Sequence, residues 1–288
     1  MKLVTFTYNG RTRIGELVGD TITVLAWVDS NVRQMIRRNV TPSRTYERFP
    51  ADKVKLEAPL NPGKIIAIGR NYVEHAKETG SKVPTEPLIF AKFPSSIIAT
   101  GDPIRWRTSI TEQVDWEGEL GVVIGKTARD VPEEDAYDYV FGYTIANDVT
   151  ARDLQMVKDT QWTRGKSLDT FCPLGPYIVT KDEIEDPHNL AVRTTINDEV
   201  MQDGSTRDMI FSIPRLIAYC SRMFTLEPGD LIMTGTPPGV GVGRSPQRFL
   251  QDGEVVTVSI EGIGEISNPC QVIAEEAVIE GAGENSED

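Results

Sequence analysis

The fold is decided by the stretch VDWEGELGVVIG at residues 114–125, an apolar run typical of a buried strand that carries two glutamates. Side chains two residues apart in a strand point to the same face, so the carboxylates of Glu117 and Glu119 converge. Burying two like charges together is costly unless one is protonated or a cation lies between them. The stretch therefore predicts a site for Mg²⁺, Mn²⁺ or Ca²⁺, which prefer hard oxygen ligands.

A polar edge strand facing water is the alternative interpretation of this stretch. The apolar residues Leu120 to Ile124 that follow directly favour a buried strand. Gly118, between the two glutamates, would leave room for a ligand to approach.

The composition is that of an ordinary globular protein, with 39% hydrophobic and 25% charged residues in a chain of 288. No apolar run approaches the roughly 20 residues that cross a bilayer, and the N-terminal residues lack the apolar core of a signal peptide. The net charge of −13 argues against non-specific binding to nucleic acid. We therefore expect a cytoplasmic protein that binds neither nucleic acid nor membrane.

The three cysteines, Cys172, Cys220 and Cys270, are widely spaced and form no CxxC motif. An odd number at this spacing indicates neither a disulfide framework nor a zinc site. We expect reduced thiols.

We predict a small N-terminal β-rich domain, a larger domain and an acidic tail. The segment Pro59-Leu60-Asn61-Pro62-Gly63 cannot continue a regular element, so the domain boundary is placed there. The last fourteen residues hold six acids and no lysine or arginine, which indicates a solvated, disordered tail. The predicted parts are residues 1–60, 61–274 and 275–288.

Strands dominate the predicted secondary structure, without a regular alternation of strands and helices. This pattern favours an α+β fold with a large mixed sheet over a doubly wound fold. The expected strands are 2–8, 13–18, 21–25, 65–69, 88–92, 116–125, 140–147, 175–180, 191–196, 230–234 and 255–260. The expected helices are 32–38, 132–139, 151–156 and 213–224.

Asp148 is a third candidate carboxylate, at the end of the predicted strand 140–147. Polar residues at strand ends often form sites. Together with Glu117 and Glu119, and with waters, it would complete an octahedral metal site that leaves positions open for a bidentate oxo acid. Alternatively, Asp148 or Thr150 caps the helix that follows.

Histidine occurs only twice in the chain. His188 lies in a polar turn and is expected to be exposed. His75 follows a buried strand, and Glu78 lies three residues later, so on one helical turn the carboxylate can orient the imidazole and raise its basicity. Such a pair can activate water, whereas the alternative is an ordinary surface helix.

Two further segments are candidates for binding anions or carbonyl groups. Lys166 could offset the charge of a developing enolate, although a lone lysine is more often exposed. The loop TGTPPGVG at residues 234–241 lacks the lysine of a P-loop, but the Thr236 hydroxyl and the loop amides could hold a substrate carboxylate.

In this order, these motifs resemble the fumarylacetoacetate hydrolase superfamily over about residues 61–273. The resemblance is carried by Gly69-Arg70-Asn71-Tyr72 with His75, Glu117 with Glu119, Asn147-Asp148 with Ala151-Arg152-Asp153 and Gln155, Gly165-Lys166-Ser167, and Thr234-Gly235-Thr236-Pro237. It implies a mixed β-sandwich roll preceded by a small N-terminal domain, and a homodimer.

The resemblance also implies roles for individual residues. It places Mg²⁺ or Mn²⁺ on Glu117, Glu119 and Asp148, where the metal chelates the carboxylate and 2-oxo group of a pyruvate moiety and stabilises an enolate. The implied catalytic residues are His75, Glu78 and Lys166. The implied substrate-binding residues are Arg70, Tyr72, Arg152, Gln155 and Thr236.

The leading hypothesis is metal-dependent hydrolysis of a C–C bond in an acylpyruvate such as fumarylpyruvate. In this reaction His75 and Glu78, on a mobile lid, would activate water. The alternatives are decarboxylation of oxaloacetate, isomerisation of a 2-hydroxy-diene dioate of aromatic catabolism, and a catalytically silent metal-binding protein. All of the enzymatic alternatives share a small 2-oxo acid substrate.

Overall fold

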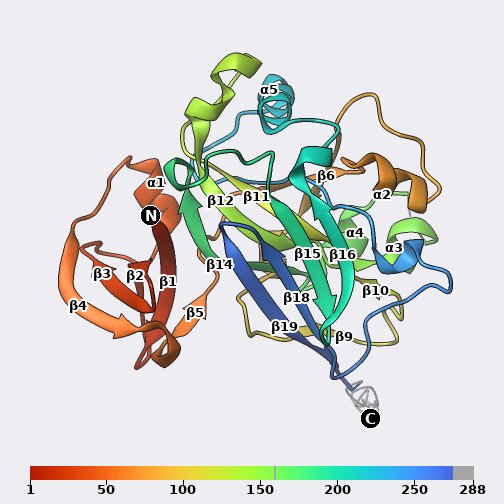
Figure 1. Ribbon diagram of the computed structural model, residues 1–288, viewed down its shortest axis with the longest axis horizontal. Coiled ribbons are helices and arrows are strands. Elements are labelled where there is room, and N and C mark those ends of the chain that lie inside the picture. The colour runs from red at the N-terminus through yellow and green to blue at the C-terminus, as the bar shows by residue number, and fades with distance from the viewer. Residues whose placement is uncertain (159, 275–288) are drawn as a thin grey trace, which may run out of the picture.

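Two β-sheets pack face to face in the computed structural model, which describes residues 1–158 and 160–274 (Figure 1). The predicted tail, 275–288, lies outside the described residues. The larger sheet has twelve strands, and ten of them follow the order β4-β3-β2-β1-β14-β12-β11-β17-β6-β7. These are β1 (Lys2–Tyr8), β2 (Arg11–Val18), β3 (Thr21–Leu25), β4 (Arg44–Pro50), β6 (Ile65–Gly69), β7 (Leu88–Lys92), β11 (Gly118–Ile124), β12 (Val140–Asn147), β14 (Cys172–Thr180) and β17 (Leu231–Met233). The other two are β5 (Lys55–Glu57), which pairs with β1, and β8 (Ile97–Ile98), which pairs with β14.

The smaller sheet has five strands in the order β16-β15-β18-β19-β9. Its apolar face covers β11 and β12, because Val192, Val258 and Ile260 share one core with Leu120 and Val122. The strands are β9 (Ile104–Trp106), β15 (Ala191–Ile196), β16 (Glu199–Ser205), β18 (Val255–Ile260) and β19 (Gly264–Val272), and a separate pair is formed by β10 (Val114–Asp115) and β13 (Thr150–Ala151).

The predicted α+β fold with mixed sheets is confirmed. Most strand pairs are antiparallel, whereas β17 runs parallel to β6. The expected helices at 32–38, 151–156 and 213–224 are present, but 132–139 is a 3-10 helix. The α-helices are α1 (Val32–Arg37), α2 (Val73–Glu78), α3 (Arg152–Met156), α4 (Thr163–Lys166) and α5 (Ile213–Met223). The 3-10 helices are η1 (Ala51–Lys53), η2 (Pro94–Ser96), η3 (Glu133–Tyr139), η4 (Lys181–Glu183), η5 (Thr206–Asp208) and η6 (Gly241–Gly243).

The N-terminal strands gather at one side of the molecule (Figure 1). They nevertheless continue the large sheet, because β1 pairs antiparallel with β14 through Lys2 opposite Val179. Leu3 and Ile14 also share a core with Ile65 from the following part of the chain. A domain division at residue 60 stays a prediction.

His188 is half-buried rather than exposed, so that expectation is wrong. Its Nε2 accepts a hydrogen bond from the Ile213 amide at 3.2 Å, at the first residue of α5. The Ser212 side chain caps the same helix end by accepting from the Arg215 amide. These contacts fix the start of α5, which buries an apolar face that includes Leu216 and Ile217.

The three cysteines are buried free thiols, as predicted. Burial raises the pKa of each to about 12, so they are protonated and unreactive near neutral pH. Across residues 1–158 and 160–274, no helix combines the length and hydropathy that a membrane span requires. The cytoplasmic location stays a prediction.

Candidate active site

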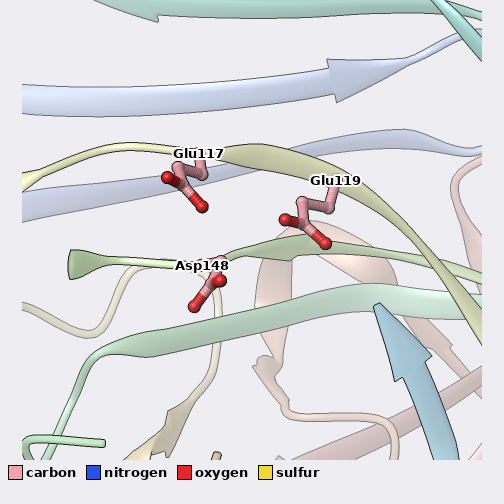
Figure 2. Close-up of side chains that lie close together, drawn as sticks. All are labelled: Glu117, Glu119 and Asp148. Atoms are coloured by element: carbon pink, nitrogen blue, oxygen red, sulfur yellow. The ribbon is translucent and has the colours of Figure 1, made fainter. Parts of the chain in front are cut away.

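Three buried carboxylates meet where β11 and β12 lie side by side. Glu117 precedes β11, Glu119 lies within it, and Asp148 follows β12; one oxygen from each lies within 4.8 Å of the others (Figure 2). The backbone fixes this arrangement, because the Asp148 amide donates to the Glu117 carbonyl at 2.8 Å. The Asn147 side chain in turn accepts from the Glu117 amide at 3.0 Å. The convergence predicted from strand alternation is therefore present.

The structure rules out two local alternatives, and it shows that one expectation is wrong. Glu117 and Glu119 are buried, so the strand is not a polar edge facing water. Neither Asp148 nor Thr150 caps α3, whose N-cap is Ala151 without a side-chain hydrogen bond. Gly118 does not leave room for a ligand, because a Cβ there would lie 2.6 Å from Thr194 Oγ1 on the smaller sheet.

Buried cations surround the carboxylates. Lys166 Nζ lies 2.7 Å from both Glu117 Oε2 and Asp148 Oδ2. Lys92 Nζ lies 2.8 Å from Asp148 Oδ1 and also donates to the Lys166 carbonyl. Arg152 contacts Glu117 at 2.6 Å, so each oxygen of Glu117 and Asp148 faces a cation.

Glu119 differs from its two neighbours because its carboxylate bonds to the Gly235 amide, at 2.9 Å, rather than to a cation. Burial, together with the charges of Asp148 and Glu117, raises its pKa well above the usual range. Burial would also raise the pKa of Glu117, but Lys166 and Arg152 outweigh it and lower that pKa. The cluster therefore holds one carboxyl group, that of Glu119, whose ionised form no contacting cation from the described part of the chain stabilises.

The donor set fits a hard divalent cation such as Mg²⁺ or Mn²⁺. All of its donors are carboxylate oxygens, and Glu117 and Asp148 already share one cation, the Lys166 ammonium. A divalent ion would also place a positive charge beside the Glu119 carboxylate, which contacts no cation among the described residues. Each carboxylate oxygen has two lone pairs, so ion pairing does not exhaust its capacity as a ligand.

Two residues that the sequence analysis did not single out support this arrangement. Asp115 is fully buried and accepts from Arg152 at 2.7 Å and from the Gly241 and Val242 amides at 2.7 and 3.0 Å. The only feature of the sequence that could have indicated this role is that Asp115 lies in the same stretch as Glu117 and Glu119. Gln202, from β16, accepts from the Gly118 amide at 3.0 Å and had no local signal.

The predicted pair of His75 and Glu78 is formed on α2. His75 Nδ1 lies 2.8 Å from Glu78 Oε1, and Glu78 Oε2 accepts from the Gly239 amide at 2.8 Å. The Glu78 carboxylate thus holds the imidazole and ties α2 to the loop that follows β17. With Nδ1 engaged as a donor, Nε2 is the ring nitrogen left to accept a proton.

A cavity of about 290 Å³ connects α2 with the carboxylates. We call Lys92, Glu117, Glu119, Asp148 and Lys166 the floor, and we call Arg70, His75, Thr79, Ser81 and Trp162 the rim. All of the rim residues line the cavity, as do Glu117, Glu119 and Lys166 from the floor. The floor is buried throughout, whereas the rim is mostly half-buried.

The predicted substrate-binding residues divide into two groups. Arg70, Arg152, Gln155 and Thr236 line the cavity. Thr236 donates to the Gly118 carbonyl at 2.9 Å, and Gln155 accepts from Arg152 at 3.0 Å. Tyr72 is 1% exposed and is not among the lining residues; burial and the charge of Glu119 raise its pKa. Their roles toward substrate stay predictions.

The two-sheet fold and the buried carboxylate cluster define an α+β protein with a candidate divalent-metal centre at the bottom of a cavity. The family model described as fumarylacetoacetate (FAA) hydrolase C-terminal matches residues 64–271. The chain therefore belongs to the fumarylacetoacetate hydrolase superfamily, and it is an enzyme of that family.

Several known proteins are similar over most of the chain. The mitochondrial oxaloacetate tautomerase fahd2 of Xenopus laevis is 54% identical over 218 residues, which cover 75% of this chain and 68% of the relative. The oxaloacetate tautomerase YisK of Bacillus subtilis (strain 168) is 50% identical over 224 residues, which cover 76% of this chain and 74% of the relative. A solved fumarylacetoacetate hydrolase from psychrophilic Exiguobacterium antarcticum is 42% identical with a TM-score of 0.88, and the match covers 95% of this chain and all of that one.

Proposed function

We propose that the protein is a divalent-metal-dependent tautomerase that interconverts the enol and keto forms of oxaloacetate. The observation that carries the proposal is that His75, held by Glu78, lines the same small cavity as Glu117, Glu119 and Lys166. Similarity to two oxaloacetate tautomerases at 50% identity or more supports the choice of reaction.

Tautomerisation moves one proton between C3 and the oxygen on C2. A bound Mg²⁺ or Mn²⁺, held by Glu117, Glu119 and Asp148, would supply Lewis acidity toward the 1-carboxylate and the C2 oxygen. His75 Nε2 takes the proton from C3 of the keto form. The electrons of the C–H bond then form the C2–C3 double bond, and the π electrons of the C2 carbonyl move to its oxygen. The imidazolium of His75 then gives the proton to that oxygen, which yields the enol and regenerates the neutral imidazole, and the reverse sequence restores the ketone.

Two further groups, Lys166 and Glu78, assist this transfer. The Lys166 ammonium, 2.7 Å from two of the carboxylates, lies where it can offset negative charge on the C2 oxygen. Glu78 stabilises the imidazolium that forms when His75 accepts the proton, as a carboxylate hydrogen-bonded to Nδ1 does. The reaction requires no water, so a small cavity suits it.

The direct test follows the near-ultraviolet absorbance of enol-oxaloacetate with purified protein, with and without Mn²⁺, while pyruvate is measured separately. The expected result is metal-dependent loss of the enol without release of pyruvate. Pyruvate released at the rate of enol loss would overturn the assignment in favour of decarboxylation. Enol loss that is unchanged after removal of metal by a chelator would overturn the metal dependence.

Hydrolysis of an acylpyruvate is the second candidate, and the same His75–Glu78 pair favours it. A histidine held by a carboxylate can deprotonate water as readily as a C–H group next to a ketone. Faster turnover of fumarylpyruvate than of enol-oxaloacetate, under identical metal conditions, would assign the pair to water activation.

A further inference from the structure

Arg70 is a half-buried cation without an acidic partner among the described residues. It lines the cavity, and burial lowers the pKa of its guanidinium, with no carboxylate opposing that effect. Its backbone has a φ of 57°, a left-handed conformation that is unfavourable for an arginine. A charge partly removed from water without a partner is costly, so its position is explained best by an anion that is supplied from outside.

An indole holds this guanidinium in place. The Arg70 guanidinium lies over the Trp162 ring, 5.1 Å from its centroid. Trp162 itself packs edge-on against Phe90, with ring centroids 5.4 Å apart and an interplanar angle of 65°. Stacking on an aromatic face orients a guanidinium while leaving its edge, with the N–H donors, free to bind.

Gly69 makes room for the indole. A Cβ at this position would lie 2.6 Å from Trp162 Cζ3, closer than carbon atoms approach. The last residue of β6 therefore has to be a glycine for Trp162 to lie beneath Arg70. The position of the Arg70 guanidinium thus depends on three features: the glycine at position 69, the left-handed backbone of Arg70, and the aromatic pair of Trp162 and Phe90.

We propose that Trp162 is a specificity-determining residue that holds Arg70 toward the cavity to bind the second carboxylate of the substrate. The site then prefers 2-oxo dicarboxylates to monocarboxylates. This inference rests on the proposed function, in which the floor engages the 1-carboxylate and the 2-oxo group. A guanidinium suits the far end because it can bind a carboxylate through two parallel hydrogen bonds.

The test compares two ligands of the Mn²⁺-loaded protein by titration calorimetry. Oxalate offers a chelating end only, whereas 3,3-difluorooxaloacetate adds a second carboxylate and cannot enolise. Arg70→Met is expected to weaken difluorooxaloacetate binding roughly 10- to 100-fold, the loss of a charge-assisted pair, and to change oxalate binding less than about twofold. Equal weakening of both ligands, or no weakening of either, would overturn the proposal.

Trp162 is tested with three variants. Trp162→Leu removes the indole, and Gly69→Ala displaces it. Each variant is expected to weaken the binding of difluorooxaloacetate roughly 5- to 10-fold and to leave the binding of oxalate unchanged. Trp162→Phe keeps an aromatic face and should restore binding to within about threefold of the original chain. If Trp162→Leu and Trp162→Phe behave alike, or if both ligands weaken together, the indole is only a packing residue and the proposal fails.

Failure of this proposal is distinguishable from failure of the proposed function. If Arg70 discriminates between the two ligands but the protein does not tautomerise oxaloacetate, the inferred substrate class stands and the proposed reaction is wrong. If tautomerase activity is insensitive to Arg70→Met and Trp162→Leu, the proposed reaction stands and the specificity role of Arg70 and Trp162 is wrong. Binding of oxalate without any binding of difluorooxaloacetate to the unsubstituted protein also overturns the inference.

Discussion

The floor and the rim of the cavity differ in what balances their charges. On the floor, Lys92 and Lys166 pair with Asp148 inside the protein, and Lys166 also pairs with Glu117. On the rim, Arg70 has no acidic partner among the described residues, and the His75 imidazole is held by a carboxylate that a backbone amide anchors. The charges of Asp148 and Glu117 on the floor are therefore balanced inside the protein, whereas we propose that Arg70 and His75 on the rim interact with parts of the substrate.

The largest effect is expected when the floor is broken at Asp148. Asp148→Asn keeps the shape of the side chain but leaves Lys92 and Lys166 without a common counter-charge. The free energy of unfolding should fall by roughly 3–5 kcal/mol, as for other buried pairs that lose one partner. Denaturant melts measure this loss. Mn²⁺ is expected to raise the Tm of the unsubstituted protein, and in Asp148→Asn this rise should disappear together with activity.

Glu112→Gln is the matched control, because Glu112 lies close in sequence but is exposed. It should leave both stability and the Mn²⁺ response unchanged. If Asp148→Asn retained the full Mn²⁺-induced rise in Tm, the carboxylate cluster would not be the metal site.

A smaller and more selective effect is expected at the rim. His75→Ala should lower tautomerase activity roughly 10²- to 10⁴-fold, the usual contribution of a general acid–base group. Since His75 contacts no floor residue through a hydrogen bond or ion pair, the Mn²⁺-induced rise in Tm should persist. If His75→Ala lost both the activity and the Mn²⁺-induced rise in Tm, the rim would also be needed for metal binding.

Glu78→Gln sharpens the comparison further. Glutamine can still accept the Gly239 hydrogen bond, but it no longer balances the charge of an imidazolium at His75. We expect roughly a tenfold loss of kcat, less than for His75→Ala, since only the partner of the base is weakened. A KM effect without a kcat effect would instead assign Glu78 to substrate binding.

The smallest effect is expected far from the cavity, at the ion pair between Glu16 and Arg44 on the N-terminal strands. A hydrogen bond from Arg44 lowers the pKa of Glu16, so this contribution to stability is present above the ordinary carboxyl pKa of about 4.5 and is lost as pH falls through the lowered value. Glu16→Gln should therefore lower Tm by no more than about 2 °C at pH 7, and by less in acid. Thermal melts across pH 3–7 measure the difference, and one that grew in acid would contradict the assignment.

The sequence predicts the floor carboxylates because the relevant rules are local. Alternation along one strand places Glu117 beside Glu119, and a strand end supplies Asp148. One helical turn likewise places His75 beside Glu78. Lys92 is different: a lysine at the end of a strand usually faces water, and nothing local shows that it is buried against Asp148.

Contacts between distant segments explain why the sequence did not predict the roles of Gln202 and Trp162 or the strand β19. Gln202 and Trp162 act on residues more than 80 positions away, so no spacing rule reaches them. The strand β19 was not predicted because it contains Asn268 and Pro269, which disfavour strands. Its pairing with β18 and β9 overrides that local preference.

The loop after β17 holds three carboxylates of the site through its peptide N–H groups. The amides of Gly235, Gly239, Gly241 and Val242 bond to the carboxylates of Glu119, Glu78 and Asp115. Point mutations change side chains but leave these amide donors in place, unless proline is introduced. Evolution can therefore vary the residues around the cavity, and with them the substrate, while these three carboxylates keep their alignment.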